Sequence, residues 1–103
     1  MNQNLLKTIK KMQDEMVTAQ KEIESTVFYA SAGGVVNIEM KGTKELLKVS
    51  VEDSFKAESA DDLELLGDMV VAACNQAYQE IDKTVKEKMG KYSDMLVSFG
   101  GLF

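Results

Sequence analysis

The chain of 103 residues contains no histidine, arginine, proline or tryptophan, and it has a single cysteine. The missing histidine removes the commonest general base and metal ligand of proteins. No paired nucleophile and no cluster of metal-binding side chains replaces it. The lone Cys74 cannot form a disulfide within the chain, which fits a reducing compartment such as the cytosol. We therefore expect no enzymatic activity, catalytic residue, metal site, cofactor or small-molecule substrate.

Long apolar segments are absent as well. The longest apolar run extends from Met69 to Cys74, which is far too short to cross a bilayer. No apolar stretch of the signal-peptide type follows the N-terminal lysines. These absences predict a cytoplasmic protein that makes no contact with a membrane.

The formal net charge of −5 excludes a protein that coats nucleic acid through an overall positive charge. The charge is unevenly distributed, however. Residues 1–13 carry three lysines and no carboxylate, and residues 83–91 carry four lysines and one glutamate. Residues 52–68 carry seven carboxylates and one lysine. The sequence thus predicts two local basic segments in an acidic chain.

The first 24 residues contain apolar side chains at alternating intervals of four and three residues. This is the spacing of a helix that packs against another helix. No glycine or proline interrupts the segment, so we expect a helix over residues 1–24. Its apolar stripe consists of Leu5, Ile9, Met12, Met16, Ala19 and Ile23.

Residues 26–52 have the pattern of a three-stranded antiparallel meander. Gly33-Gly34 and Gly42-Thr43 are turn signals between segments in which apolar and polar residues alternate. Such strands place their apolar side chains on one face, which a helix has to cover. That face consists of Val36, Ile38 and Met40 in the middle strand and Leu47, Val49 and Val51 in the last.

A second helix is predicted over residues 59–96, because Ser59 followed by Asp62 is typical of a helix start. It would be roughly 55 Å long, whereas the strands cover only about 20–25 Å. Its distal half, with Val85 and Met89, must therefore pack against the first helix or against a second copy of the chain. We expect a single α+β domain over residues 1–103, with a flexible tail at residues 97–103.

If the two helices pack side by side, they are antiparallel, and their basic segments meet at one end. The lysines brought together are Lys7, Lys10, Lys11, Lys83, Lys86, Lys88 and Lys91. Together they are candidates for contact with the phosphates of nucleic acid. The alternative is that they are solvated and pair along their own helix, as in Lys11–Glu15 and Asp82–Lys86.

Two segments resemble a known family. SAGGVVNIEMKGTKELLKVSVE is similar to its glycine-then-hairpin core, and LELLGDMVVAACNQAYQEIDKTVKEKM, with its AACNQA run, is similar to its last helix. The family is that of the YbaB/EbfC nucleoid-associated proteins, and the resemblance extends over residues 5–95. The chain departs from it in lacking a proline-containing C-terminus.

The resemblance implies an α-β-β-β-α protomer and a homodimer shaped like tweezers. It also implies binding to double-stranded DNA with little sequence preference, and a nucleoid location with a role in nucleoid organisation and gene expression. The residues expected to hold the dimer or the helix pair are Leu5, Ile9, Met12, Met16, Ile23, Val85 and Met89.

A different class of function fits the same pattern. A dimeric scaffold or chaperone-like clamp could hold a protein segment in an apolar cleft between its helices, with no direct nucleic-acid binding. The acidic net charge favours this alternative, since it repels phosphate at long range.

Overall fold

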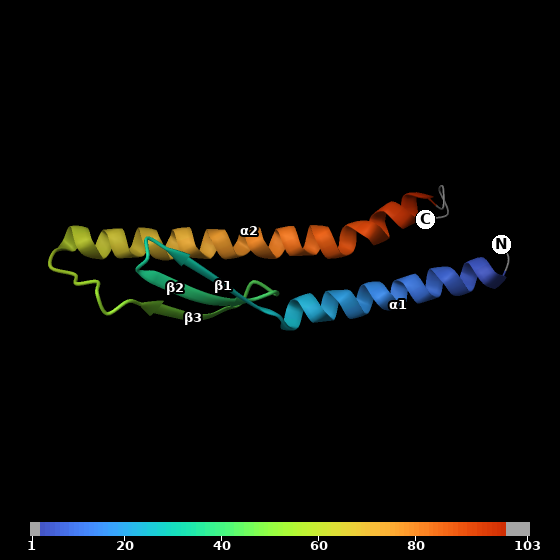
Figure 1. Ribbon diagram of the computed structural model, residues 1–103, viewed down its shortest axis with the longest axis horizontal. Helices are drawn as coiled ribbons and strands as arrows, with labels where there is room; N and C mark the ends of the chain where they lie inside the picture. Colours follow the sequence, from blue (N-terminus) through green and yellow to red (C-terminus); the bar gives the residue numbers. More distant parts are fainter. Residues whose placement is uncertain (1–2, 99–103) are drawn as a thin grey trace.

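The computed structural model describes residues 3–98 and has the order helix, three strands, helix. The elements are α1 (Gln3–Ser25), β1 (Val27–Ala32), β2 (Val36–Lys41), β3 (Leu46–Val51) and α2 (Ala60–Ser98). The molecule measures 70 × 21 × 15 Å, and α2 runs along its length with the sheet and α1 end to end beside it (Figure 1). The predicted α+β architecture is confirmed.

The first helix ends where hydroxyl groups bond to its last turn. Ser25 Oγ and Thr26 Oγ1 both donate to the carbonyl oxygen of Glu22, at 3.1 and 2.6 Å. The Thr26 N–H also donates to the carbonyl oxygen of Ile23 at 3.1 Å. These bonds satisfy carbonyl groups that a helix end otherwise leaves open, so α1 passes directly into β1.

The three strands form one antiparallel sheet in the order β1-β2-β3. Gly33 and Gly34, in the turn between β1 and β2, have φ angles of +61° and +64°, a conformation that glycine adopts without strain. In β2 the predicted alternation is present, because Val36, Ile38 and Met40 are buried.

The core lies between this face of the sheet and the first half of α2. Ala73, Ala77 and Ile81 of α2 and Ala30 of β1 are buried in the same cluster as the apolar residues of β2. Ala73 and Ala77 are fully buried, and their small side chains let α2 lie close to the strands.

The start of α2 is capped as the sequence predicts. The backbone N–H of Asp62 donates to Ser59 Oγ at 3.3 Å, and Asp62 Oδ2 accepts from the N–H of Glu58 at 2.8 Å. This is a variant of the capping box in which the Asp62 carboxylate bonds the N–H of the residue before Ser59. The helix continues through Gly67 and Gly90 and ends at Ser98, two residues beyond the predicted end. Residues 99–103 of the predicted tail lie outside the described residues.

One expectation about the sheet was wrong. The apolar side chains of β3 are not covered by a helix, since Leu47, Val49 and Val51 are 46%, 40% and 41% exposed. α2 packs on β1 and β2 instead. A helix is about 10 Å wide and strands are spaced about 4.8 Å apart, so one helix covers two strands. The apolar face of the third strand stays open.

Candidate nucleic-acid interface

Beyond the sheet, the molecule continues as two antiparallel helices, α1 and residues 81–98 of α2, which we call the arm (Figure 1). Met12 and Ile23 of α1 and Ile81 and Tyr92 of α2 are buried. The remaining predicted seam residues are half-buried, namely Leu5, Ile9, Met16, Val85 and Met89. The predicted seam residues thus follow the buried side of two helices that pack within one chain. A role for them between two copies stays a prediction.

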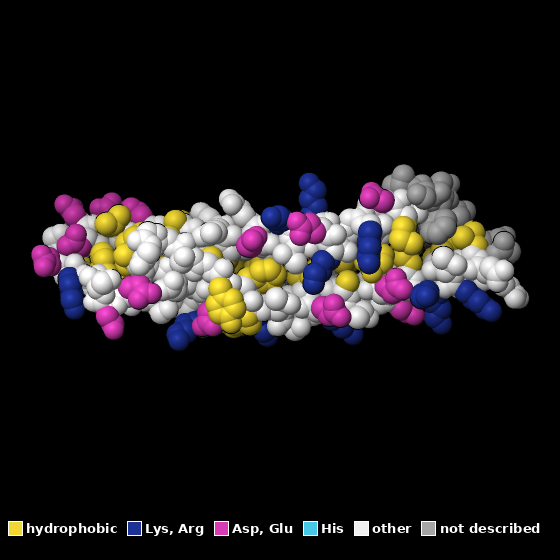
Figure 2. All heavy atoms as spheres, viewed as in Figure 1, with side chains coloured by type: hydrophobic (Ala, Val, Ile, Leu, Met, Phe, Trp, Pro, Cys, Tyr) yellow, Lys and Arg dark blue, Asp and Glu magenta, His cyan; other side chains and the backbone are white. Residues whose placement is uncertain are grey.

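The antiparallel packing brings Lys88 and Lys91 of α2 beside Lys11 of α1, whereas Lys83 directly follows Asp82, where α2 enters the arm. Residues 3–13 and 83–98, which we call the basic tip, contain seven lysines and two carboxylates, Glu87 and Asp94. All seven lysines are exposed: Lys7, Lys10, Lys11, Lys83, Lys86, Lys88 and Lys91. Carboxylates gather instead at the end of the molecule where α2 begins (Figure 2).

One side of the arm has an open groove of about 710 Å³ between α1 and α2. Lysines from both helices line it, namely Lys11, Lys88 and Lys91. This places basic groups of α1 and α2 around a common space, as the antiparallel arrangement of the helices predicts.

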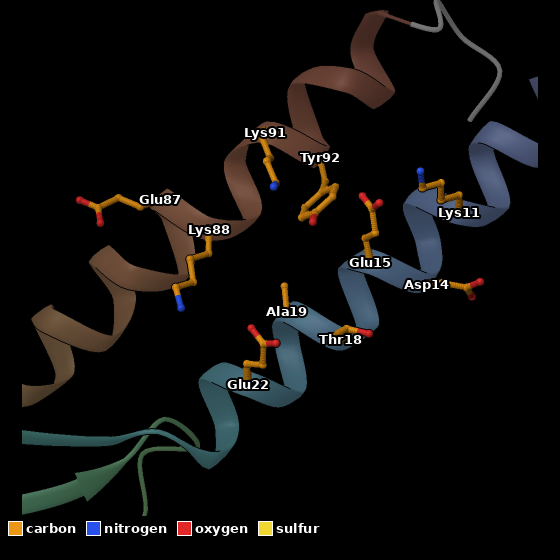
Figure 3. A pocket seen from close by; sticks show the side chains of 10 residues that line it. All are labelled: Lys11, Asp14, Glu15, Thr18, Ala19, Glu22, Glu87, Lys88, Lys91 and Tyr92. Atoms are coloured by element: carbon orange, nitrogen blue, oxygen red, sulfur yellow. The ribbon is translucent and has the colours of Figure 1, made fainter.

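Four carboxylates line the same groove, namely Asp14, Glu15, Glu22 and Glu87. In Figure 3 the side chains of Glu15 and Tyr92 point into the space between the helices, whereas Asp14 and Glu87 point away from it. The groove is therefore of mixed charge and does not attract phosphate into its interior. Of these acids, Glu15 was considered in the sequence analysis, and only as a partner of Lys11 along the helix. The four-residue interval between Lys11 and Glu15 was the available signal.

Tyr92 anchors one of the tip lysines. Its side chain is 4% exposed, and Lys91 Nζ lies 4.9 Å from the centroid of its ring. An ammonium group at this distance from an aromatic ring is attracted to it. Lys91 is therefore held over the buried ring at the edge of the groove.

The opposite side of the arm has a smaller groove of about 350 Å³, in which apolar side chains are prominent. Met16 and Val17 of α1 and Met89 of α2 form its apolar part, and Gln20, Lys21 and Glu24 complete it. Its apolar part corresponds to the cleft that a protein clamp would need.

The body of the molecule has a further apolar surface, the open face, which combines β3 with one side of α2. Val71 of α2 is 59% exposed and lies two helical turns before Tyr78, hence on the same side of the helix. Lys44, in the turn that leads into β3, lies 5.9 Å from the Tyr78 ring, so this side of α2 runs beside β3. The open face comprises Leu47, Val49, Val51, Val71 and Tyr78.

Residues 3–98 contain no group of three or more cysteine, aspartate or glutamate side chains placed to hold a metal ion. Within the same range, neither helix has a stretch that is long and apolar enough to span a membrane.

The sequence pattern of the YbaB/EbfC DNA-binding family matches residues 1–96. A nucleoid-associated protein of Clostridium novyi is 39% identical over 101 residues, covering 97% of this chain and 86% of the relative. One from Bacillus thuringiensis is 37% identical, covering 97% and 91%.

A solved structure shares the fold. The crystal structure of an uncharacterized protein from Helicobacter pylori superposes with a TM-score of 0.59 at 21% identity, covering 78% of this chain and 92% of that one. This likeness concerns the arrangement of the helices and strands alone.

Proposed function

Because the chain belongs to the YbaB/EbfC DNA-binding family, we propose that this nucleoid-associated protein binds double-stranded DNA through the basic tip of its arm. The family is a DNA-binding family and not an enzyme family.

The segregation of charge carries the proposal. The basic tip has seven lysines and two carboxylates, whereas the rest of the chain has five lysines and fifteen carboxylates. Only the tip can approach a polyanion without repulsion. Each phosphate that a lysine neutralises releases counterions, which provides affinity independent of sequence.

The absence of arginine bears on specificity. Lysine is a compact point charge that contacts phosphate well, whereas reading of guanine by two parallel hydrogen bonds is chiefly the task of arginine. Contacts to phosphate position a protein but carry no sequence information. We therefore propose binding with little sequence preference, suited to organising the nucleoid and influencing gene expression.

A homodimer is the second part of the proposal. Val49 and Val51 lie opposite Ile38 and Val36 in the sheet and thus face the side on which α2 packs, yet they are exposed beside that helix. Apolar side chains clustered in this way are typical of interfaces. A second copy placed on the open face would cover them and add a second arm, giving the tweezer-like pair.

The rival function, a protein clamp without DNA binding, has the small apolar groove of the arm in its favour. It does not account for the charge of the tip, and the family match favours DNA. We propose accordingly that the protein acts in the cytoplasm, at the nucleoid.

Fluorescence anisotropy of a labelled duplex of about 30 base pairs, titrated at several salt concentrations, tests the proposal. We expect the logarithm of the binding constant to fall linearly with the logarithm of the salt concentration, with a slope of about −0.9 per phosphate contacted. No binding at low salt would contradict the proposal. Binding that is insensitive to salt would contradict the lysine contacts.

A further inference from the structure

The turn between β2 and β3 reaches the end of α1 at the root of the arm. The Gly42 N–H donates to the carbonyl oxygen of Thr26 at 2.9 Å. A Cβ atom added to Gly42 would overlap the backbone carbonyl of Ile23, the third-last residue of α1. The turn therefore lies directly against the C-terminal end of α1.

The same turn also reaches α2. Lys44 Nζ lies 2.8 Å from Asp82 Oδ1 and 5.9 Å from the centroid of the Tyr78 ring. Asp82 and Tyr78 are one helical turn apart on α2, so the lysine spans a defined stretch of that helix. Asp82 thus pairs across the fold rather than with Lys86, which was the pair suggested by spacing along the helix.

Lys44 has a left-handed backbone conformation. Its φ is +72°, a conformation that is costly for residues other than glycine and that asparagine tolerates better than lysine. Glycine would fit the backbone of this turn with less strain. What the lysine contributes here is its side chain, which bonds to α2.

The two helices of the arm are incompletely packed against each other. Grooves remain on both sides of the contact between α1 and α2, and most of the seam residues are half-buried. From residue 82 to residue 98, α2 extends about 24 Å. A rotation of 10° at the root therefore displaces the tip by about 4 Å, comparable to the rise of about 3.4 Å per nucleotide along a DNA strand.

We propose that Lys44 is a positioning residue for DNA binding: by bonding α2 while its turn holds α1, it sets the separation of the two groups of lysines at the basic tip. It lies at the root of the arm and is not one of the lysines proposed to contact DNA. The inference rests on the proposed function, since it concerns how the same tip is held in its binding geometry.

Two substitutions separate this role from simple electrostatics. Lys44→Gly removes one positive charge, and Asp82→Asn removes one negative charge. If charge alone mattered, Asp82→Asn would strengthen DNA binding. If the pair positions the arm, both substitutions weaken binding, and the double variant is no worse than either single one.

The experiment combines DNA affinity with a distance measurement. Nitroxide labels on Thr8→Cys and Ser93→Cys, in a Cys74→Ala background, report the separation of α1 and α2 near the tip. Labelled protein is diluted with excess unlabelled protein, so that distances within one chain dominate. Duplex affinity is measured by anisotropy on the same variants without labels.

We expect Lys44→Gly and Asp82→Asn each to broaden the distance distribution and to lower DNA affinity about two- to five-fold, a small effect because both side chains of the ion pair are exposed, at 46% and 64%. Lys44→Arg should retain the parent values. Lys56→Gly is the matched control, because it makes the same change of charge and residue type outside the arm. It should leave the distances unchanged.

The thermal midpoint of Lys44→Gly should stay at or above that of the parent, since glycine relieves the positive φ, so weaker binding would not reflect unfolding. An unchanged distance distribution, or stronger binding by Asp82→Asn, would overturn the positioning role. If the parent chain fails to bind duplex at low salt, the proposed function is overturned, and the distance distributions still decide whether Lys44 fixes the arm.

Discussion

Gly42, in the turn between β2 and β3, lies against the C-terminal end of α1. It lies against the backbone carbonyl of Ile23, where even a methyl group has no room. A backbone atom cannot move aside as the end of a flexible side chain can, so a substitution here must shift α1 or the turn.

Two glycine-to-alanine substitutions should therefore have opposite effects. Gly42→Ala should lower the free energy of unfolding by about 1–3 kcal/mol, the usual cost of overpacking. Gly90→Ala should raise it by about 0.5–1 kcal/mol, because Gly90 lies within α2 with open space around it. Urea denaturation followed by circular dichroism measures both. A Gly42→Ala variant as stable as the parent would contradict the close contact.

At the scale of the element, α1 divides its surface between two tasks. The side with Met12 and Ile23 is buried in the molecule. Lys7, Lys10 and Lys11 are exposed away from that stripe. The two sets can thus be changed independently, which makes α1 the best place to test the DNA contact.

Replacing Lys7, Lys10 and Lys11 together by Glu should lower duplex affinity tenfold or more at moderate salt and make the dependence on salt shallower, since about three phosphate contacts are lost. The secondary structure and the association state should be unchanged. Anisotropy and sedimentation velocity measure these quantities.

The control places the same charge reversal outside the basic tip, in Lys21→Glu, Lys48→Glu and Lys56→Glu combined. Both triple variants have the same net charge. Equal loss of affinity in the two would contradict a local contact and indicate a response to overall charge alone.

The element scale also shows what sequence can predict. Both helices, the strand order and the cap of α2 follow from signals local to each segment, such as the alternation in β2 and the Ser59–Asp62 pair. The exposure of the apolar side chains of β3 cannot be predicted in this way. Apolar and polar residues alternate in β3 as they do in β2, and only the width of α2 decides which strands it covers.

The candidate site was predictable to the same extent. The meeting of two lysine segments follows from the antiparallel packing of two helices. The Lys44–Asp82 pair joins residues 38 positions apart, and its formation depends on how the turn meets α2. No local pattern contains that information, and the carboxylates of the groove depend on the rotation of the helices in the same way.

At the scale of the whole molecule, the proposed DNA-binding unit is a pair of chains. It has one arm, and the open face leaves the apolar side chains of β3 in contact with water. Pairing of two chains through the open face would cover them and bring two arms together. Linked binding sites gain affinity because the second contact is intramolecular.

Val49→Glu should shift the protein from dimer to monomer in sedimentation velocity and lower its duplex affinity, because a charge cannot be buried at an apolar interface without a partner. Val17→Glu is the matched control, since Val17 is also exposed, at 53% against 40%, but lies on the arm. A dimeric Val49→Glu protein would show that another surface joins the copies.

The separation of charge over an elongated molecule also has a kinetic consequence. With lysines at one end and carboxylates toward the other, the chain is an electric dipole, and the field of a polyanion rotates it until the arm points forward. If DNA binds at the basic tip as proposed, the acidic body would repel it in other orientations. The uneven distribution of charge, rather than the net charge of −5, would then orient the molecule, and added salt should weaken this orientation as well as the complex.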